Sequence, residues 1–227
     1  MSNLFNSLVD FLRQAITWAP GLFLGVILHE YAHGYIAYKQ GDPTARNMGR
    51  LTLNPVAHID IFGTIILPLL LILLNSNIVF GYAKPVPINS NYFRDFRKGI
   101  RYTSLAGIVT NLLIAFMLGS VFGLYAFLTR NTYNAAIQFI ADIFIFAIYI
   151  NIFLAVFNLI PIPPLDGSKV LASFLPSNAM YKYLSLGRFG FIFIFIILFL
   201  GGSFFWNIIS PVVGFIYSMC LWWQYLI

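Results

Sequence analysis

The chain has 227 residues, of which 60% are hydrophobic and 9% are charged. Soluble domains carry about 25% charged residues, so this composition excludes an ordinary soluble protein and predicts an integral membrane protein. The net charge of +6 is placed in particular loops, which indicates membrane topology rather than nucleic-acid binding. The single cysteine, Cys220, excludes a zinc site built from cysteines. The N-terminus lacks the features of a cleaved secretory signal, so we expect it to be retained.

The first apolar segment, expected to be a helix over about residues 18–39, contains the sequence HEYAH at residues 29–33. His29 and His33 are four positions apart, so they lie on one face of a helix and can share one metal ion. Two imidazole nitrogens suit zinc, and in an H-E-x-x-H helix the glutamate is the general base of peptide hydrolysis. Glu30 is the only glutamate in the chain. Because ionisable residues inside a membrane are costly, we favour a functional role over a structural pair of histidines.

The next apolar segment, residues 61–74, is about fourteen residues long and contains Pro68, so it is short for a full crossing. We expect it to be re-entrant, entering and leaving by the same membrane face. Residues 79–88 follow with two prolines and several β-forming side chains, and we expect a short extended strand there, with an ordinary loop as the alternative.

The positive charges discriminate between two topologies. With a re-entrant 61–74 segment, the Lys and Arg residues divide 11 against 2 between the two sides. With a full crossing, they divide 9 against 4. The positive-inside rule favours the first division and places residues 29–33 toward the cytoplasmic side of a multi-pass cell-membrane protein.

Later apolar runs predict crossings at about 101–128 and 133–160 and two short helices within 189–227. We therefore predict an all-α polytopic membrane protein with about five to six transmembrane helices, a re-entrant segment and a short strand near the site. Residues 1–227 form a single domain, with a core at about 18–175 and a C-terminal helical hairpin at about 187–227. We expect the protein to be embedded in the lipid bilayer.

A catalytic zinc site needs a third protein ligand, and three candidates exist. Asp166 ends the stretch NLIPIPPLD, whose three prolines must terminate the preceding helix, and irregular backbone at membrane depth lines a cavity. Asp166 could instead be a helix N-cap. His58 is the rival, although a hydrogen-bonding role fits it better. Asp142 is the third candidate and reads more simply as a carboxylate near the start of its helix.

Together these segments resemble the site-2 protease family of intramembrane zinc metalloproteases, in its compact prokaryotic form without PDZ or CBS domains. The resemblance covers most of residues 19–175 and rests on these motifs: HEYAH at 29–33, GDP at 41–43, GRLTLNP at 49–55, HID at 58–60, GT at 63–64, GYAKPVPIN at 81–89, AG at 106–107 with Asn111, and residues 158–167. One departure is Ile108, where the family has proline; this alters helix geometry near the site but removes no ligand.

The resemblance implies one zinc ion per chain held by His29, His33 and Asp166, with Glu30 as the general base and Asn158 in contact with substrate or oxyanion. The implied activity is endopeptidase cleavage of transmembrane protein substrates. We also assign side chains to substrate binding, namely His58, Asn111, Tyr82 and Lys84.

Two other functions compete with proteolysis. A membrane metal binder or transporter would keep the histidines, but it would need no carboxylate placed as Glu30 is, and internal repeats would be expected. An inactive scaffold of the same fold would usually have lost the base or a ligand, and this chain keeps all of them.

Overall fold

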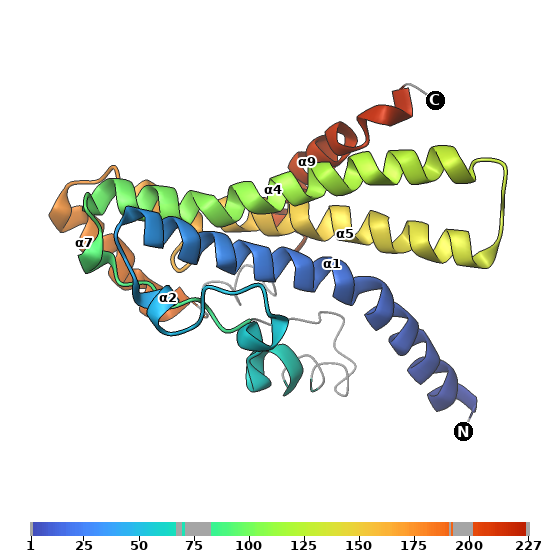
Figure 1. Cartoon of the computed structure of the whole chain (residues 1–227), viewed down its shortest axis with the longest axis horizontal. Helices are drawn as coiled ribbons and strands as arrows, with labels where there is room; N and C mark the ends of the chain where they lie inside the picture. Colours follow the sequence, from blue (N-terminus) through green and yellow to red (C-terminus); the bar gives the residue numbers. More distant parts are fainter. Residues whose placement is uncertain (1, 67–69, 71–82, 191, 193–201, 226–227) are drawn as a thin grey trace.

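The computed structural model of the protein describes residues 2–66, 70, 83–190, 192 and 202–225. Within these ranges every regular element is a helix and no residue forms a strand, which confirms the all-α prediction. Three long helices pack on one another at the centre: α1 (Ser2–Gln40), α4 (Phe96–Thr129) and α5 (Ala135–Leu159). Figure 1 shows α4 and α5 as a long hairpin, with α1 lying along it before its N-terminal part leaves the bundle.

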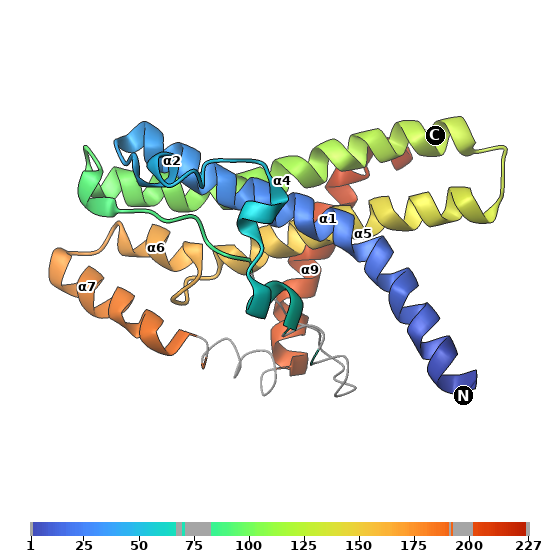
Figure 2. The same ribbon diagram turned by 60° about the horizontal axis from the view of Figure 1, so that its bottom comes forward.

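Short elements connect these helices. Between α1 and α4 lie α2 (Thr44–Asn47), η1 (Pro55–His58), η2 (Ile61–Ile66) and η3 (Ser90–Tyr92). After α5 come α6 (Asp166–Ala172), α7 (Ser177–Ser185) and η4 (Leu186–Phe189), and then α9 (Gly202–Cys220) and η5 (Trp222–Tyr225). Figure 2 shows α2, α6 and α7 gathered at the end of the bundle where α1 finishes, while α9 crosses α5 farther along. Side chains from α4, α5 and α9 form the apolar core, including Ala115, Ile148, Ile152, Ile209 and Val213.

Local chemistry sets the ends of the long helices. Asp95 caps α4 by accepting the backbone N–H of Lys98, and this bond holds the pKa of the Asp95 carboxyl below its usual value. Asn134 caps α5 in the same way through the N–H of Ile137. α5 ends at Leu159 because the prolines that follow cannot donate the backbone hydrogen bonds of a further turn.

Among the described residues, α4 and α5 are long and apolar enough to cross a membrane. They coincide with the crossings expected at 101–128 and 133–160. α1 begins earlier than expected, at Ser2 rather than near residue 18, and continues through Pro20. The re-entrant course expected for 61–74 lies mostly outside the described residues, which include only 61–66 and 70 of that segment; so does most of the first arm of the hairpin expected at 187–227.

The strand expected over 79–88 is wrong for its described part, residues 83–88, which have no regular structure. The physical reason is the absence of a pairing ladder. The N–H of Lys84 donates to the carbonyl of His58, which belongs to the short helix η1 and not to a strand. Pro85 and Pro87 have no N–H to donate. The segment is held by single contacts instead of by a neighbouring strand.

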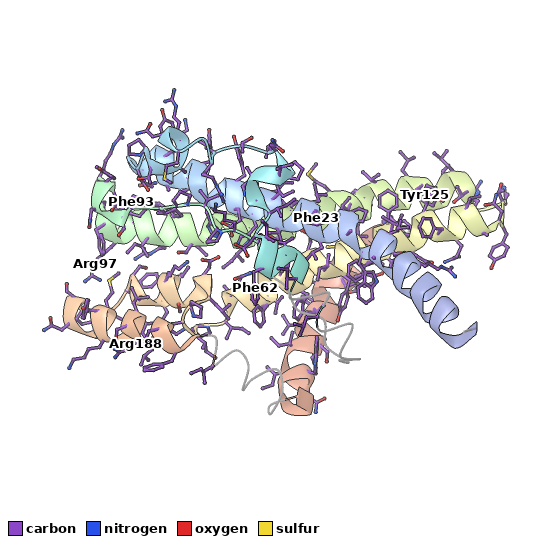
Figure 3. All side chains as sticks on the ribbon, turned by 90° about the horizontal axis from the view of Figure 1, so that it is seen from below. Phe23, Phe62, Phe93, Arg97, Tyr125 and Arg188 are labelled. Carbon is purple, nitrogen blue, oxygen red and sulfur yellow. The ribbon has the colours of Figure 1, made fainter. Side chains whose placement is uncertain are left out.

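The basic run at the start of α4 fastens the α6 segment. Arg97 donates to the carbonyl oxygens of Ser173 and Leu175 just beyond α6, and Figure 3 shows it at the end of α4 beside α6 and α7. Arg101 donates to the Ser173 hydroxyl and lies over the Phe174 ring, 3.8 Å from its centroid. These contacts satisfy carbonyl groups that a helix C-terminus leaves without intrahelical partners.

Replacing Arg97 with Gln should therefore destabilise the protein. Loss of charge-assisted bonds to two carbonyls predicts a decrease in unfolding free energy of about 1–3 kcal/mol, seen as a lower melting temperature of the detergent-solubilised protein. Lys98→Gln is the matched control, because the Lys98 side chain makes an exposed ion pair with Asp95 at 3.7 Å, a type of contact that contributes little to stability. Equal melting temperatures for the two variants would contradict this role of Arg97.

Candidate metal centre

Three buried side chains converge where α1 meets the start of α6. His29 and His33 lie one turn apart on α1, and Asp166 is the first residue of α6. The Nε2 atoms of the two histidines are 2.9 Å apart, and the Asp166 Oδ2 atom lies 3.2 Å from Nε2 of His29 and 2.9 Å from Nε2 of His33. All three residues are less than 10% exposed, at 8%, 7% and 5%. They are the group of potential metal ligands found among the described residues.

The hydrogen bonds at the Nδ1 atoms of the two histidines determine whether their Nε2 atoms can bind a metal. Nδ1 of His29 is 2.9 Å from the amide oxygen of Asn111, and Nδ1 of His33 is 2.6 Å from the carbonyl oxygen of Thr103. Each Nδ1 therefore carries the proton and donates it, which leaves the lone pair on Nε2. When both imidazoles are neutral, two Nε2 lone pairs and a carboxylate oxygen therefore face one another. A bound cation resolves this arrangement, and the donor set of two imidazoles and a carboxylate fits zinc.

The second oxygen of Asp166 has its own partner. Nζ of Lys169, one helical turn along α6, lies 2.9 Å from Oδ1. The lysine holds this oxygen while Oδ2 faces the histidines. It also offsets one negative charge in a centre that contains two carboxylates, those of Asp166 and Glu30.

Glu30 lies between the two histidines in the chain, and the segment 83–88 covers it. Its Oε2 atom accepts the backbone N–H of Val86 at 2.8 Å. Arg50 also holds that segment by donating to the carbonyl oxygens of Lys84 and Pro85. Val86 itself is buried, at 5% exposure. One carboxylate oxygen of Glu30 is thereby fixed to the backbone.

Asn111 and His58 are both buried, but Asn111 contacts a ligand histidine and His58 contacts a loop carbonyl. Asn111, at 0% exposure, supports His29 from behind, whereas we expected it to contact substrate. His58 does not join the metal-ligand group: its Nε2 atom is 2.8 Å from the Thr52 carbonyl, and its Nδ1 atom has no partner among the described residues.

The remaining described residues of the expected site have other hydrogen-bond partners. Asn158 donates to the Leu154 carbonyl within its own helix. Lys84 contributes backbone contacts to the segment over Glu30. Asp142 bonds to Gln138 in the first half of α5, and Tyr82 lies outside the described residues.

Sequence reasoning missed the supporting contacts of Thr103, Lys169 and Val86. Only Lys169 had a local signal, because side chains three positions apart on a helix meet. The carbonyl of Thr103 and the N–H of Val86 are backbone groups brought in from distant parts of the chain. Gly107 was identified as part of a motif, but the sequence did not show why a glycine is needed there. A Cβ built at this position would lie 2.5 to 2.7 Å from three atoms of the His29 ring, which is too close.

Comparison with known proteins places this chain in a family. Residues 61–200 match the model of Peptidase family M50. The chain is 38% identical to the protein named "Putative zinc metalloprotease YwhC" of Bacillus subtilis (strain 168), over 88% of this chain and 90% of that protein. It is 29% identical to "Putative zinc metalloprotease Rip2" of Mycolicibacterium smegmatis and 27% identical to Rip2 of Mycobacterium tuberculosis H37Rv, over 78% of this chain and 64% of each relative. No solved structure matches the chain.

The close approach of Gly107 to His29 predicts that Gly107→Ala will impair metal binding. The added methyl cannot fit without displacing the imidazole, so zinc affinity should fall by at least about tenfold in a chelator competition assay. The matched control is Gly214→Ala in α9, where a Cβ meets no atom within 4 Å. Unchanged zinc affinity in a folded Gly107→Ala protein would show that His29 is not held against this helix.

Proposed function

Because the chain belongs to Peptidase family M50, the site-2 protease family, we propose that this metalloprotease is a zinc-dependent intramembrane endopeptidase. Its substrates would be membrane proteins, cleaved in or near their transmembrane segments. The observation that carries the proposal is the convergence of two imidazole lone pairs and a carboxylate oxygen beside the only glutamate of the chain. This is a donor set and a neighbouring base of the kind that zinc-dependent peptide hydrolysis uses.

In this proposal His29, His33 and Asp166 hold one zinc ion per chain. Bound zinc supplies a Lewis acid that polarises the scissile carbonyl and makes water a stronger acid. The protein's part is to keep the ligands in position: Asn111 and Thr103 fix the two imidazole rings, and Lys169 fixes the carboxylate.

Glu30 is the proposed general base. It takes a proton from the attacking water, holds it on a carboxylate oxygen and transfers it to the departing amide nitrogen. The N–H of Val86 engages Oε2, so Oε1 is the oxygen left to receive that proton. Asn158 is the proposed contact for substrate or oxyanion, and His58, Tyr82 and Lys84 remain proposed substrate contacts. For Asn111 we propose the supporting role instead.

A helical substrate must unwind locally before attack, because its carbonyl groups are engaged in hydrogen bonds within the helix. Water must also reach the site. His33 is six residues before Lys39, which corresponds to about 9 Å of helix, so the metal would lie below the membrane surface but not at the bilayer centre. The distribution of Lys and Arg supports a multi-pass cell-membrane protein, one domain over residues 1–227, with this side facing the cytoplasm.

The decisive test is to purify the protein in detergent, measure bound zinc and assay cleavage of a panel of transmembrane peptides. Glu30→Gln should retain zinc and lose about 10²- to 10⁴-fold in cleavage rate, because it removes the base but no ligand. Asp166→Ala should lose both zinc and cleavage. His58→Ala is the comparison for the third ligand and should retain zinc.

Two results would contradict the proposal. Undiminished cleavage by Glu30→Gln would exclude Glu30 as the base. Normal zinc binding by Asp166→Ala together with zinc loss in His58→Ala would show that His58, and not Asp166, is the third ligand.

A further inference from the structure

A second cavity lies between α1, α5 and α9, far from the metal centre. It is open on one side and has a volume of about 650 Å³, within the range of roughly 300 to 1,000 Å³ typical of ligand pockets. Arg13 lines it from the N-terminal half of α1, Asp142 and Tyr149 line it from α5, and Tyr217 lines it from α9. Arg13 precedes His29 by 16 residues, or about 24 Å of helix, so this cavity is separate from the active site.

Two opposite charges line this cavity without forming an ion pair with one another. Among the described residues, no ion pair within 4.0 Å joins Arg13 to Asp142. The Asp142 carboxylate accepts a single bond from the Gln138 amide, at 3.0 Å. Arg13 is exposed and Asp142 is partly buried, so a ligand that supplies the complementary charges can reach both groups.

The aromatic residues that line the cavity indicate its position along the membrane normal. Trp18 of α1 stacks on Phe146 of α5 with ring centroids 5.0 Å apart, and Tyr149 and Tyr217 add polar hydroxyl groups. Trp and Tyr gather where lipid head groups meet hydrocarbon. Asp142 lies seven residues from the start of α5, about 10 Å along its axis, which places the charges near one end of this crossing.

We propose that this cavity binds the head group of a zwitterionic phospholipid that carries a primary ammonium, such as phosphatidylethanolamine. Its phosphate would contact Arg13 and its ammonium would donate to Asp142. An anionic lipid such as phosphatidylglycerol would satisfy Arg13 but place its negative charge beside Asp142. A choline head group has no N–H to donate to the carboxylate.

Native mass spectrometry of the full chain tests this proposal. The detergent-solubilised protein is titrated with phosphatidylethanolamine, phosphatidylglycerol and phosphatidylcholine of identical acyl chains, and with water-soluble glycerophosphoethanolamine. Phosphatidylethanolamine should bind at least about fivefold more tightly than each of the others, the ratio expected for one head-group charge contact. Arg13→Gln and Asp142→Asn should each remove this preference.

Two variants serve as controls. Arg130→Gln should leave the preference unchanged, because Arg130 lies over the Phe127 ring and does not line the cavity. Arg13→Lys keeps the charge and should keep the preference, which separates loss of a contact from misfolding. Zinc content equal to that of the unmodified protein shows that each variant is folded.

Equal affinity for the three lipids, or a preference that survives both Arg13→Gln and Asp142→Asn, would overturn the proposal. Binding of glycerophosphoethanolamine as tight as that of the lipid would assign the cavity to a soluble zwitterion instead. Binding of a transmembrane peptide that depends on Arg13 and Asp142, without any preference among lipids, would assign it to a protein partner and likewise overturn the lipid site.

Discussion

Three lone pairs pointing at one another are the constraint on which this structure depends. Without a cation, the Nε2 atoms of His29 and His33 and the Oδ2 atom of Asp166 would repel, and close packing leaves them little freedom to separate. The surrounding protein maintains this arrangement. α4 supplies the acceptors that fix both imidazole rings, and its Gly107 lets the helix backbone approach one of them. A metal site of this kind is built by the supporting helix as much as by its ligands.

The third ligand is positioned by a different set of forces. Prolines after Leu159 stop α5, and the chain turns to begin α6 at Asp166. The other end of α6 is fastened to α4 through Arg97 and Arg101. Arg97 and Arg101 therefore stabilise the position of α6 in addition to contributing to the count of positive charges. The same helix that orients the histidines also anchors the helix that delivers the carboxylate.

Sequence reasoning went furthest where chemistry is local. The i, i+4 spacing of the histidines put them on one face. The proline-rich turn made Asp166 one of three candidates for the third ligand, and the family resemblance favoured it. The structure brings His29, His33 and Asp166 together. It failed where distant backbone decides the outcome. A strand over 83–88 needs a partner strand that the described chain lacks. The contact between Asn111 and His29, which we did not predict, depends on how α1 and α4 pack. The charge count bears on topology, but most of segment 61–74 lies outside the described residues.

The central claim is that two histidines and one aspartate hold zinc, and X-ray absorption at the zinc edge of the purified protein tests it most directly. The account predicts stoichiometric zinc with only nitrogen and oxygen neighbours at about 2.0–2.2 Å, and outer-shell scattering that corresponds to two imidazole rings. Scattering from three imidazoles would bring His58 into the centre and contradict the assignment of Asp166. A sulfur neighbour, or a protein without zinc after reconstitution, would contradict the metal centre itself.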